Sequence, residues 1–414
     1  MESDFDLTTA LRQLCRAATP LAAASGTLRN RAIAAIATSL KQNAATILEA
    51  NTLDLETLRG EDLPAWELDS LKLTPERLHH LAEQLDRVAG FADPIGGGDR
   101  LQTFESRQSL TQQRVPLGTL ALAYEVYPEW CLSGISMALK TGNSVIVAND
   151  GPLQATQDAM ADIASTAAYE VGIPEGAIQS IPGGQTEHFI SLLRQSRYLE
   201  LVLACGRRAW VESIAEMATV ATLRAELPQC SIYIDASATW EQVWQSVLQH
   251  PSLPDCRESA NADKRLTHHV PHAQFLLHAD WAQEYLGAFL TQLQQQDCAI
   301  QAEVSTSTKS DTTLPLERSQ LRVETVADVD EAIATITSSD IPAAAIVTDS
   351  RSRARQFSRQ LKTSAVFVNQ FPDVAELARQ TTGVFLGWGA APLSARGIID
   401  FRALTAVKYL AEGD

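Results

Sequence analysis

The sequence lacks the features that would place the protein in a membrane or outside the cell. No run of about 18 apolar residues is present, although a helix that crosses a bilayer needs about 20. The acidic start "MESDFDLTTA" also lacks the basic and apolar regions of a secretory signal. We therefore expect a cytoplasmic protein with no membrane partner.

Positive charge is scarce as well. The 414 residues include 33 Lys and Arg against 50 Asp and Glu, which gives a formal net charge of −17. A protein with this charge repels the phosphate backbone of nucleic acids and anionic lipid surfaces. We therefore expect no nucleic-acid partner.

Clustered metal ligands and paired cysteines are also missing. The 6 cysteines are scattered and none forms a CxxC pair. In so long a chain, this spacing indicates reduced thiols rather than a disulfide or zinc framework. His268, His269 and His272 are close in sequence, but Pro271 interrupts any helix that would bring two of them together at a metal. No metal site is predicted.

The chain does contain enough apolar residues, 45% of the total, to bury a core. Residues 5–92 have helical apolar spacing, after which short apolar runs alternate with helical stretches. The segments "TLALAYEVYP", "NSVIVAND" and "YLELVLACG" are typical of buried strands. Strict alternation predicts an α/β fold with parallel sheets, and a second α/β unit is predicted from "SIYIDAS" onward.

Ligand-binding residues in a parallel sheet follow the carboxyl ends of strands, where the next helix offers free backbone N–H groups. We expect a cofactor cleft there, although the sequence has neither GxGxxG nor GxxxxGK[ST]. Asp150 could accept hydrogen bonds from the hydroxyls of an adenosine ribose, or could belong to an Asn-Asp-Gly turn. Arg207 could meet a bound anion, or only solvent. The candidate cofactor residues are Asn149, Asp150, Gly183, Gly184, Gly206 and Arg207.

A candidate nucleophile is Cys256, in "LPDCRESANAD". Arg257 beside it favours the thiolate, whereas Asp255 and Glu258 oppose it. The alternative is a structural or incidental loop cysteine. Ser259 follows closely, but nearness in the chain says nothing of hydrogen-bond geometry to a histidine.

Several segments together resemble the γ-glutamyl phosphate reductase family, whose members are also called glutamate-5-semialdehyde dehydrogenases. They include "RVPLGTLALAYEVYP", "LKTGNSVIVAND", "VFVNQF" and the tail "ARGIIDFRALTAVKYLAEGD". The resemblance implies an aldehyde dehydrogenase-like fold. It places a Rossmann-like cofactor domain at 1–103 and 119–229, a catalytic domain at 230–366, and a small oligomerisation element at 104–118 and 396–414.

The resemblance also implies an activity, namely reduction of L-glutamate 5-phosphate by NADPH to glutamate 5-semialdehyde and phosphate in proline biosynthesis. In the family, a cysteine thiolate attacks the acyl phosphate, phosphate leaves, and hydride reduces the thioester. NADP(H) is thus the expected cofactor. NAD(H) is not excluded, because Asp150 and the loss of a basic turn disfavour a 2′-phosphate. A homo-oligomer is expected, with glutamate 5-kinase as a candidate partner.

Catalytic positions depart from the family pattern. Glu129 falls where the family has an asparagine that looks like an oxyanion donor, and an ionised carboxylate cannot donate. Alignment without gaps puts Ser259 at the nucleophile position, one inserted residue puts Ala260 there, and Cys256 lies earlier. Three interpretations remain: a reductase that uses Cys256, a catalytically degenerate paralogue that acts as a binding or scaffolding subunit, and an esterase-like enzyme that uses Ser259.

Overall fold

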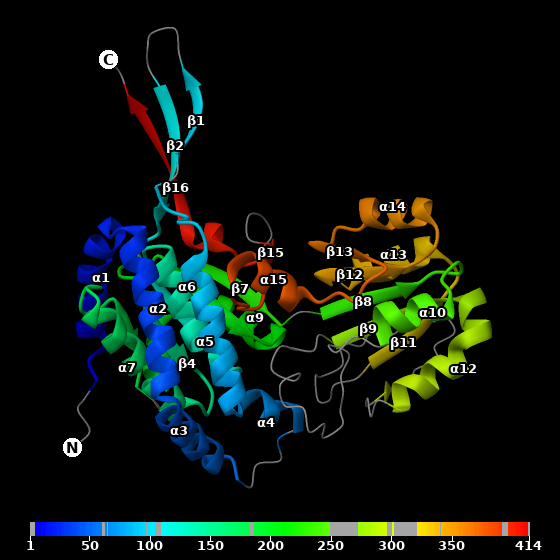
Figure 1. Cartoon of the computed structure of the whole chain (residues 1–414), viewed down its shortest axis with the longest axis horizontal. Coiled ribbons are helices and arrows are strands. Elements are labelled where there is room, and N and C mark those ends of the chain that lie inside the picture. The colour runs from blue at the N-terminus through cyan, green and yellow to red at the C-terminus, as the bar shows by residue number, and fades with distance from the viewer. Residues whose placement is uncertain are drawn as a thin grey trace. The chain divides into compact units, whose positions relative to one another are not determined.

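A computed structural model gives the structure of most of the chain, as two compact units (Figure 1). It describes residues 5–59, 63, 65–96, 98–103, 109–182, 186–227, 229–248, 272–295, 300–301, 321–339, 341–390 and 396–412. The first unit comprises residues 1–226 and 378–414, and the second comprises residues 227–377. Both contain parallel strands with intervening helices, so the expected α/β class is confirmed.

The first unit begins with the helices that the apolar spacing predicts. Side chains cap several of them: Asp6, Ser25 and Thr74 each accept a hydrogen bond from a backbone N–H of the first turn. These helices are α1 (Leu7–Ala23), α2 (Gly26–Gln42), α3 (Ala44–Thr57), α4 (Ala65–Leu71) and α5 (Pro75–Gly90).

A seven-stranded sheet forms the centre of the first unit, in the order β15-β14-β7-β6-β3-β4-β5. Its parallel strands are β3 (Thr119–Tyr124), β4 (Ser144–Asn149), β5 (Ile178–Ser180), β6 (Leu201–Gly206) and β7 (Thr222–Glu226). Two antiparallel strands extend one edge, β14 (Trp388–Ala390) and β15 (Arg396–Ile398). Both β3 and β4 are buried at every position, which explains their uninterrupted apolar sequences.

Four helices connect these strands: α6 (Glu129–Lys140), α7 (Gln154–Glu170), α8 (Thr186–Leu192) and α9 (Arg208–Met217). The chain passes from β3 to β4 and β5, and α8 then returns it to β6 on the other side of β3. The strand order therefore reverses between β3 and β6. In open α/β sheets this switch point is where ligands bind, beyond the carboxyl ends of the strands.

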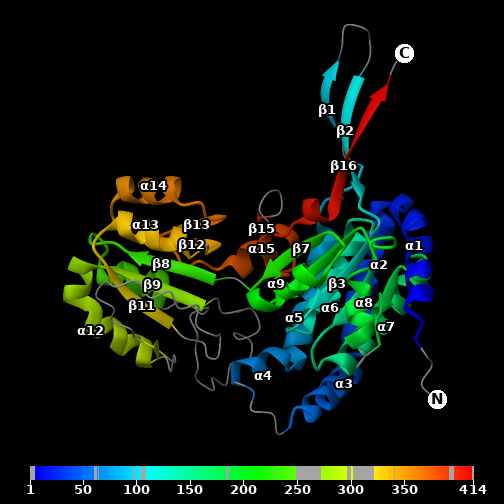
Figure 2. The same ribbon diagram turned by 180° about the vertical axis from the view of Figure 1, so that it is seen from behind.

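A three-stranded antiparallel sheet joins distant parts of the first unit, in the order β1-β2-β16. It consists of β1 (Gly98–Thr103), β2 (Ser109–Pro116) and β16 (Thr405–Glu412). Figure 2 shows this sheet extending away from the helices of the first unit. The 3-10 turn Phe401–Leu404 precedes β16, and the side chain of Asn143 donates to the backbone carbonyl of Leu404 at 2.8 Å.

The second unit is built on a six-stranded parallel sheet, in the order β10-β11-β9-β8-β12-β13. The strands are β8 (Gln229–Ile234), β9 (His272–His278), β10 (Ile300–Gln301), β11 (Leu321–Val326), β12 (Ala343–Val347) and β13 (Ala365–Val368). Its helices are α10 (Trp240–Val243), continued by a π-helical turn (Trp244–Leu248), α12 (Ala279–Gln295), α13 (Val329–Ser338) and α14 (Arg351–Gln360); α15 (Val374–Thr382) leads back to the first unit.

Candidate functional site

The switch point of the first unit carries an ion pair between the residues that follow its two central strands. Glu125 follows β3, and its backbone N–H donates to the carbonyl of Cys205 in β6 at 3.2 Å. Arg207 follows β6 as the N-cap residue of α9. Because β3 and β6 are hydrogen-bonded neighbours, their carboxyl ends bring these side chains together.

The Glu125 carboxylate accepts from Arg207 through both its oxygens. The Nε of Arg207 lies 2.8 Å from Oε1, which the Nη2 atom also contacts, and the backbone N–H of Arg207 donates to Oε2 at 3.1 Å. Glu67 from α4 adds a second carboxylate, 3.3 Å from Nη1. Burial lowers the pKa of Arg207, but hydrogen bonds and charge from Glu125 and Glu67 outweigh it, so the pKa lies above its usual value.

An indole ring covers the adjacent backbone of β6. Trp210 in α9 donates from Nε1 to the Oδ2 atom of Asp150 at 3.0 Å. A Cβ atom at Gly206 would lie only 2.6 Å from Cε3 of Trp210, so only glycine accommodates the ring there. Asp150 is exposed to solvent, and its carboxylate nevertheless accepts this hydrogen bond from a side chain of the same unit.

The buried Asn149 organises the turn that follows β4. Its Nδ2 donates to the carbonyl of Tyr124 at 2.9 Å, and its Oδ1 accepts from the N–H groups of Gly151 and Leu153 at 2.8 and 3.3 Å. Both the Nδ2 and the Oδ1 atom of this amide are thus hydrogen-bonded to the backbone of the chain itself. This geometry corresponds to the turn that an Asn-Asp-Gly sequence favours.

Glu129 is the first residue of α6 and forms a two-point ion pair with Arg77 of α5. The Nη2 of Arg77 lies 2.6 Å from Oε2 of Glu129, and its Nε contacts Oε1. The same guanidinium donates to the backbone carbonyls of Asp69 at 2.9 Å, of Ser70 at 3.3 Å and of Lys72. Position 129 therefore accepts hydrogen bonds from a cation, and an ionised carboxylate there has no proton to donate.

Tyr127, between these two acidic residues, has a backbone φ of +53°, in the left-handed region that bulky residues avoid. The backbone N–H of Trp130 donates to its carbonyl at 2.9 Å, and the two rings meet edge to face with centroids 5.2 Å apart. Burial raises the pKa of Tyr127 to about 12.

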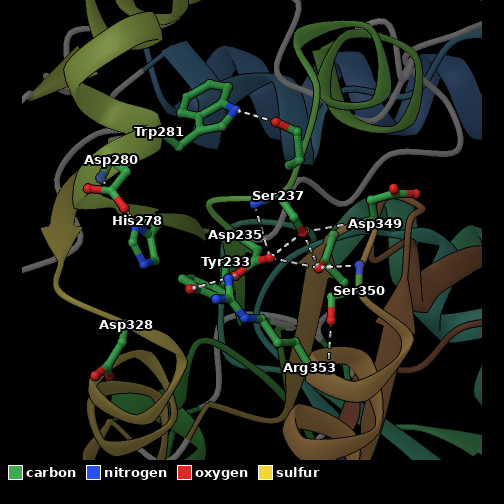
Figure 3. Close-up of polar contacts among 12 residues, drawn as sticks. Tyr233, Asp235, Ser237, His278, Asp280, Trp281, Asp328, Asp349, Ser350 and Arg353 are labelled. Carbon is green, nitrogen blue, oxygen red and sulfur yellow. Dashed lines mark hydrogen bonds and ion pairs between the residues drawn. The ribbon is translucent and has the colours of Figure 1, made fainter.

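The second unit has its own polar cluster at the carboxyl ends of β8 and β12, around Asp235 (Figure 3). This carboxylate is fully buried and accepts from Nη1 of Arg353 at 2.5 Å, from the hydroxyls of Ser237 and Thr348 at 2.5 and 2.8 Å, and from Tyr233 at 3.2 Å. Burial raises the pKa of Asp235, but these hydrogen bonds hold it below its usual value. All of these donors belong to the second unit. The hydrogen bond from Thr348 to Asp235 joins the end of β12 to the end of β8, and the one from Arg353 adds the start of α14.

The structure describes only part of the predicted site. Gly183, Gly184, Cys256 and Ser259 lie outside the described residues. Within the described ranges, no group of His, Cys, Asp and Glu is placed to hold a metal ion, and no helix is long and apolar enough to cross a membrane. The remaining predicted residues all lie at the carboxyl ends of β4 and β6 or at the start of α6: Glu129, Asn149, Asp150, Gly206 and Arg207.

Sequence reasoning missed several residues of this edge. Glu125 lies near the end of the predicted strand "TLALAYEVYP" and directly follows the observed strand β3, so the strand-end position that indicates Asn149 indicates Glu125 as well. Glu67 and Arg77 come from the helical region far earlier in the chain, and no local pattern links them to the sheet. Trp210 lies on the helix after Arg207, where an aromatic residue ordinarily indicates packing.

Comparison with known proteins gives a consistent set of relatives. No family model matches the chain. The chain is 32% identical to the gamma-glutamyl phosphate reductase of Gloeobacter violaceus over 411 residues, which cover 96% of this chain and 94% of that protein. It is 29% identical over 412 residues to the enzyme of the same name from Heliobacterium modesticaldum, covering 96% and 95% of the two chains.

Solved structures agree with the sequence relatives. The gamma-glutamyl phosphate reductase of Thermotoga maritima superposes with a TM-score of 0.83 at 24% identity, over 99% of both chains. An indole-3-acetaldehyde dehydrogenase in complex with NAD⁺ gives a TM-score of 0.71 at 17% identity, over 99% of this chain and 89% of that one. The expected aldehyde dehydrogenase-like fold is therefore confirmed.

Proposed function

Because this chain belongs to the gamma-glutamyl phosphate reductase family, we propose that it reduces L-glutamate 5-phosphate to L-glutamate 5-semialdehyde in proline biosynthesis. A nicotinamide dinucleotide would supply the hydride, and phosphate would leave. The observation that supports this proposal is the similarity over 96% of the chain to proteins named for that activity. A cytoplasmic homo-oligomer, with glutamate 5-kinase as a candidate partner, belongs to the same proposal.

Cys256 is the proposed nucleophile, and Ser259 is the alternative, because alignment without gaps puts it at the nucleophile position. A thiolate at Cys256 would attack the acyl phosphate, and the resulting thioester would accept the hydride. Glu129 is held by Arg77 as a hydrogen-bond acceptor, so it would not stabilise the developing oxyanion. The proposed reaction would therefore lack one hydrogen-bond donor at this position.

For the cofactor, family resemblance points to NADP(H), whereas the residues at β4 argue for NAD(H). Asp150 is an exposed carboxylate at the carboxyl end of β4, where charge repulsion disfavours a 2′-phosphate. We therefore expect NADH to bind no more weakly than NADPH. Titration calorimetry with both reduced dinucleotides tests this, and a clear preference for NADPH would contradict it.

The side chains at the switch point do not fit a dinucleotide in the arrangement that the structure has. Glu125 and Glu67 hold Arg207, and Trp210 covers the backbone of Gly206, at the switch point where ligands bind in sheets of this kind. A dinucleotide would have to displace these contacts.

A second candidate function is that of a catalytically degenerate binding or scaffolding subunit. The specific observation in its favour is the Glu129–Arg77 pair, which fixes an acceptor where the family resemblance implies an oxyanion donor. Such a subunit would still assemble with copies of itself or with an active relative, but would not turn over the semialdehyde.

The reverse reaction separates these functions. Purified protein would be given glutamate 5-semialdehyde, phosphate and NADP⁺ or NAD⁺, with an active family member as the control. Reduction of dinucleotide by the wild type, and its loss in Cys256→Ala but not in Ser259→Ala, supports the thiolate route. The converse loss supports Ser259. No turnover in any of the three proteins beside an active control overturns the reductase proposal.

A further inference from the structure

The switch point between β3 and β6 is bridged by side chains of the chain itself, which bears on how the proposed reductase would take its cofactor. We infer that Glu125 and Arg207 form a latch, in which Glu125 competes with the phosphates of a dinucleotide for Arg207. A dinucleotide therefore binds the first unit weakly, and only when Arg207 leaves Glu125. This inference rests on the proposed function, because it concerns the cofactor of that reaction.

The position of the latch follows from the strand order. The residue pairs of β3 and β6 run in register up to Tyr124 opposite Cys205, and Glu125 and Arg207 lie just beyond this last pair. The ligand crevice of a doubly wound sheet opens at this place, outside the carboxyl ends of the two strands. The latch thus spans the crevice from one strand end to the other.

The contacts of the latch are those that a phosphate would otherwise make. Glu125 takes the guanidinium of Arg207 on one oxygen, and on the other the backbone N–H of Arg207, at the start of α9. A guanidinium and a helix N-terminal N–H are the usual partners of phosphate groups in proteins. Only 11% of the Glu125 side chain and 28% of the Arg207 side chain are exposed, so water weakens the pair less than it would on an open surface.

Trp210 reinforces the latch on the side toward β4. Its ring rests on Gly206, and Asp150 holds its Nε1 atom at 3.0 Å. Phe189 supports the same ring, with centroids 6.4 Å apart. A glycine without a side chain over it leaves room for a phosphate near the backbone, but at Gly206 the indole of Trp210 fills that space.

The local charge also disfavours a phosphate while the latch is closed. Glu67, Glu125 and Asp150 contribute carboxylates to this edge, and Arg207 is engaged with the first two. The neighbouring Arg208 faces acidic residues as well, with Glu212 at 3.1 Å and Glu226 at 3.9 Å. Repulsion between carboxylates and phosphate adds to the cost of opening the latch.

Titration calorimetry with NADH and NADPH tests the latch directly. In Glu125→Gln, the amide oxygen can still accept from the backbone N–H of Arg207, but the competing charge is gone. We expect this variant to bind at least one of the two dinucleotides about tenfold more tightly than the wild type, since Arg207 becomes available to phosphate. Glu67→Gln should tighten binding in the same direction by a smaller factor.

The matched control is Glu212→Gln. It removes the same charge from α9, the helix that Arg207 caps, but its partner is Arg208, which lies outside the latch. We expect its affinity for both dinucleotides to stay within about twofold of the wild type. Thermal unfolding of each variant checks that it is folded before binding is compared.

The outcomes of this experiment are distinct from those of the activity test. Equal affinities of the wild type and Glu125→Gln overturn the latch, whether both bind tightly or neither binds. Tighter binding by Glu125→Gln and by Glu212→Gln to the same extent also overturns it, because general charge then explains the effect. Tighter dinucleotide binding in Glu125→Gln but not in Glu212→Gln supports the latch. If the wild type also fails to turn over the semialdehyde in the activity test, the latch stands and the reductase proposal is contradicted.

Discussion

At the scale of single residues, acidic side chains at strand and helix ends are matched by arginines from other elements. Each carboxylate is largely removed from water, so its charge would be costly without the partner. The arginine in turn fixes which element lies next to the acidic residue. The pairs are Glu125 with Arg207, Glu129 with Arg77, and Asp235 with Arg353.

Asp235→Ala should lower the free energy of unfolding of the second unit by about 3 kcal/mol, because buried hydroxyls and a guanidinium lose their acceptor. Asp349 lies in the same cluster region but is exposed, so Asp349→Ala should cost less than about 0.5 kcal/mol. Urea unfolding followed by circular dichroism measures both values. Equal, small effects would show that the cluster contributes nothing to stability.

The same carboxylate makes stability depend on pH. Because the pKa of Asp235 is lower in the folded protein than in the unfolded chain, its contribution is fully present above the unfolded pKa of about 3.9. It is lost as the pH falls through the folded value. Asp235→Asn should therefore lose less stability than the wild type when the pH is lowered from about 5 to about 2.5. Parallel urea titrations measure it, and identical losses would refute the prediction.

At the scale of elements, Lys140 joins the end of α6 to two other helices. Its buried ammonium donates to Oδ1 of Asn30 in α2 at 2.7 Å and to the backbone carbonyls of Ala89 and Phe91 at the end of α5, the first at 3.3 Å. Arg29 in α2 donates to the carbonyl of Lys140 and pairs with Asp93. These contacts hold α2 and the end of α5 against α6.

Lys140→Ala should destabilise the first unit by about 2 to 3 kcal/mol, because the carbonyl groups and the amide lose a buried donor. Lys41→Ala removes an exposed lysine of the same helical layer, 3.2 Å from Asp86, and should cost less than about 1 kcal/mol. Thermal unfolding of the two variants compares them. A loss in Lys140→Ala no larger than in Lys41→Ala would contradict this role.

The elements themselves could largely be predicted from the sequence. The apolar runs of β3 and β4 and the apolar spacing of α1 to α5 are local signals, and each gives the expected structure. Partner choice is different. Arg77 could have paired with any carboxylate near α5, and its selection of Glu129 depends on tertiary packing, to which no local pattern refers. The sequence leaves open whether Arg207 contacts an anion or solvent, and in the structure its anion is the side chain of Glu125.

At the scale of the whole molecule, the sheet β1-β2-β16 bears on assembly, because β16 exposes apolar side chains. Strand β16 pairs with β2 along its whole length, and exposes Tyr409 at 62% and Val407 at 39%. Exposed apolar side chains on a projecting strand favour contact with a further chain. The proposed homo-oligomer would use this strand.

Tyr409→Glu should therefore shift the protein to a smaller species in solution, because it places a charge among apolar side chains. Lys408→Glu adds acidic charge at the neighbouring position, whose side chain points to the opposite face of the strand, and should leave the assembly as it is. Size-exclusion chromatography with light scattering gives the molar mass of each variant. A wild type that is already a monomer of 45.0 kDa would rule out assembly through this strand.

The Glu129–Arg77 pair also constrains how this sequence can evolve. An asparagine at position 129, the residue that the family resemblance implies there, would leave the guanidinium of Arg77, only 12% exposed, without its counter-charge. Replacing Arg77 first would strand a carboxylate that is only 16% exposed. Each single step thus passes through a less stable protein, and the two substitutions are epistatic. A lineage that carries this pair would therefore exchange it for other residues only by changing both positions, or after gaining stability elsewhere.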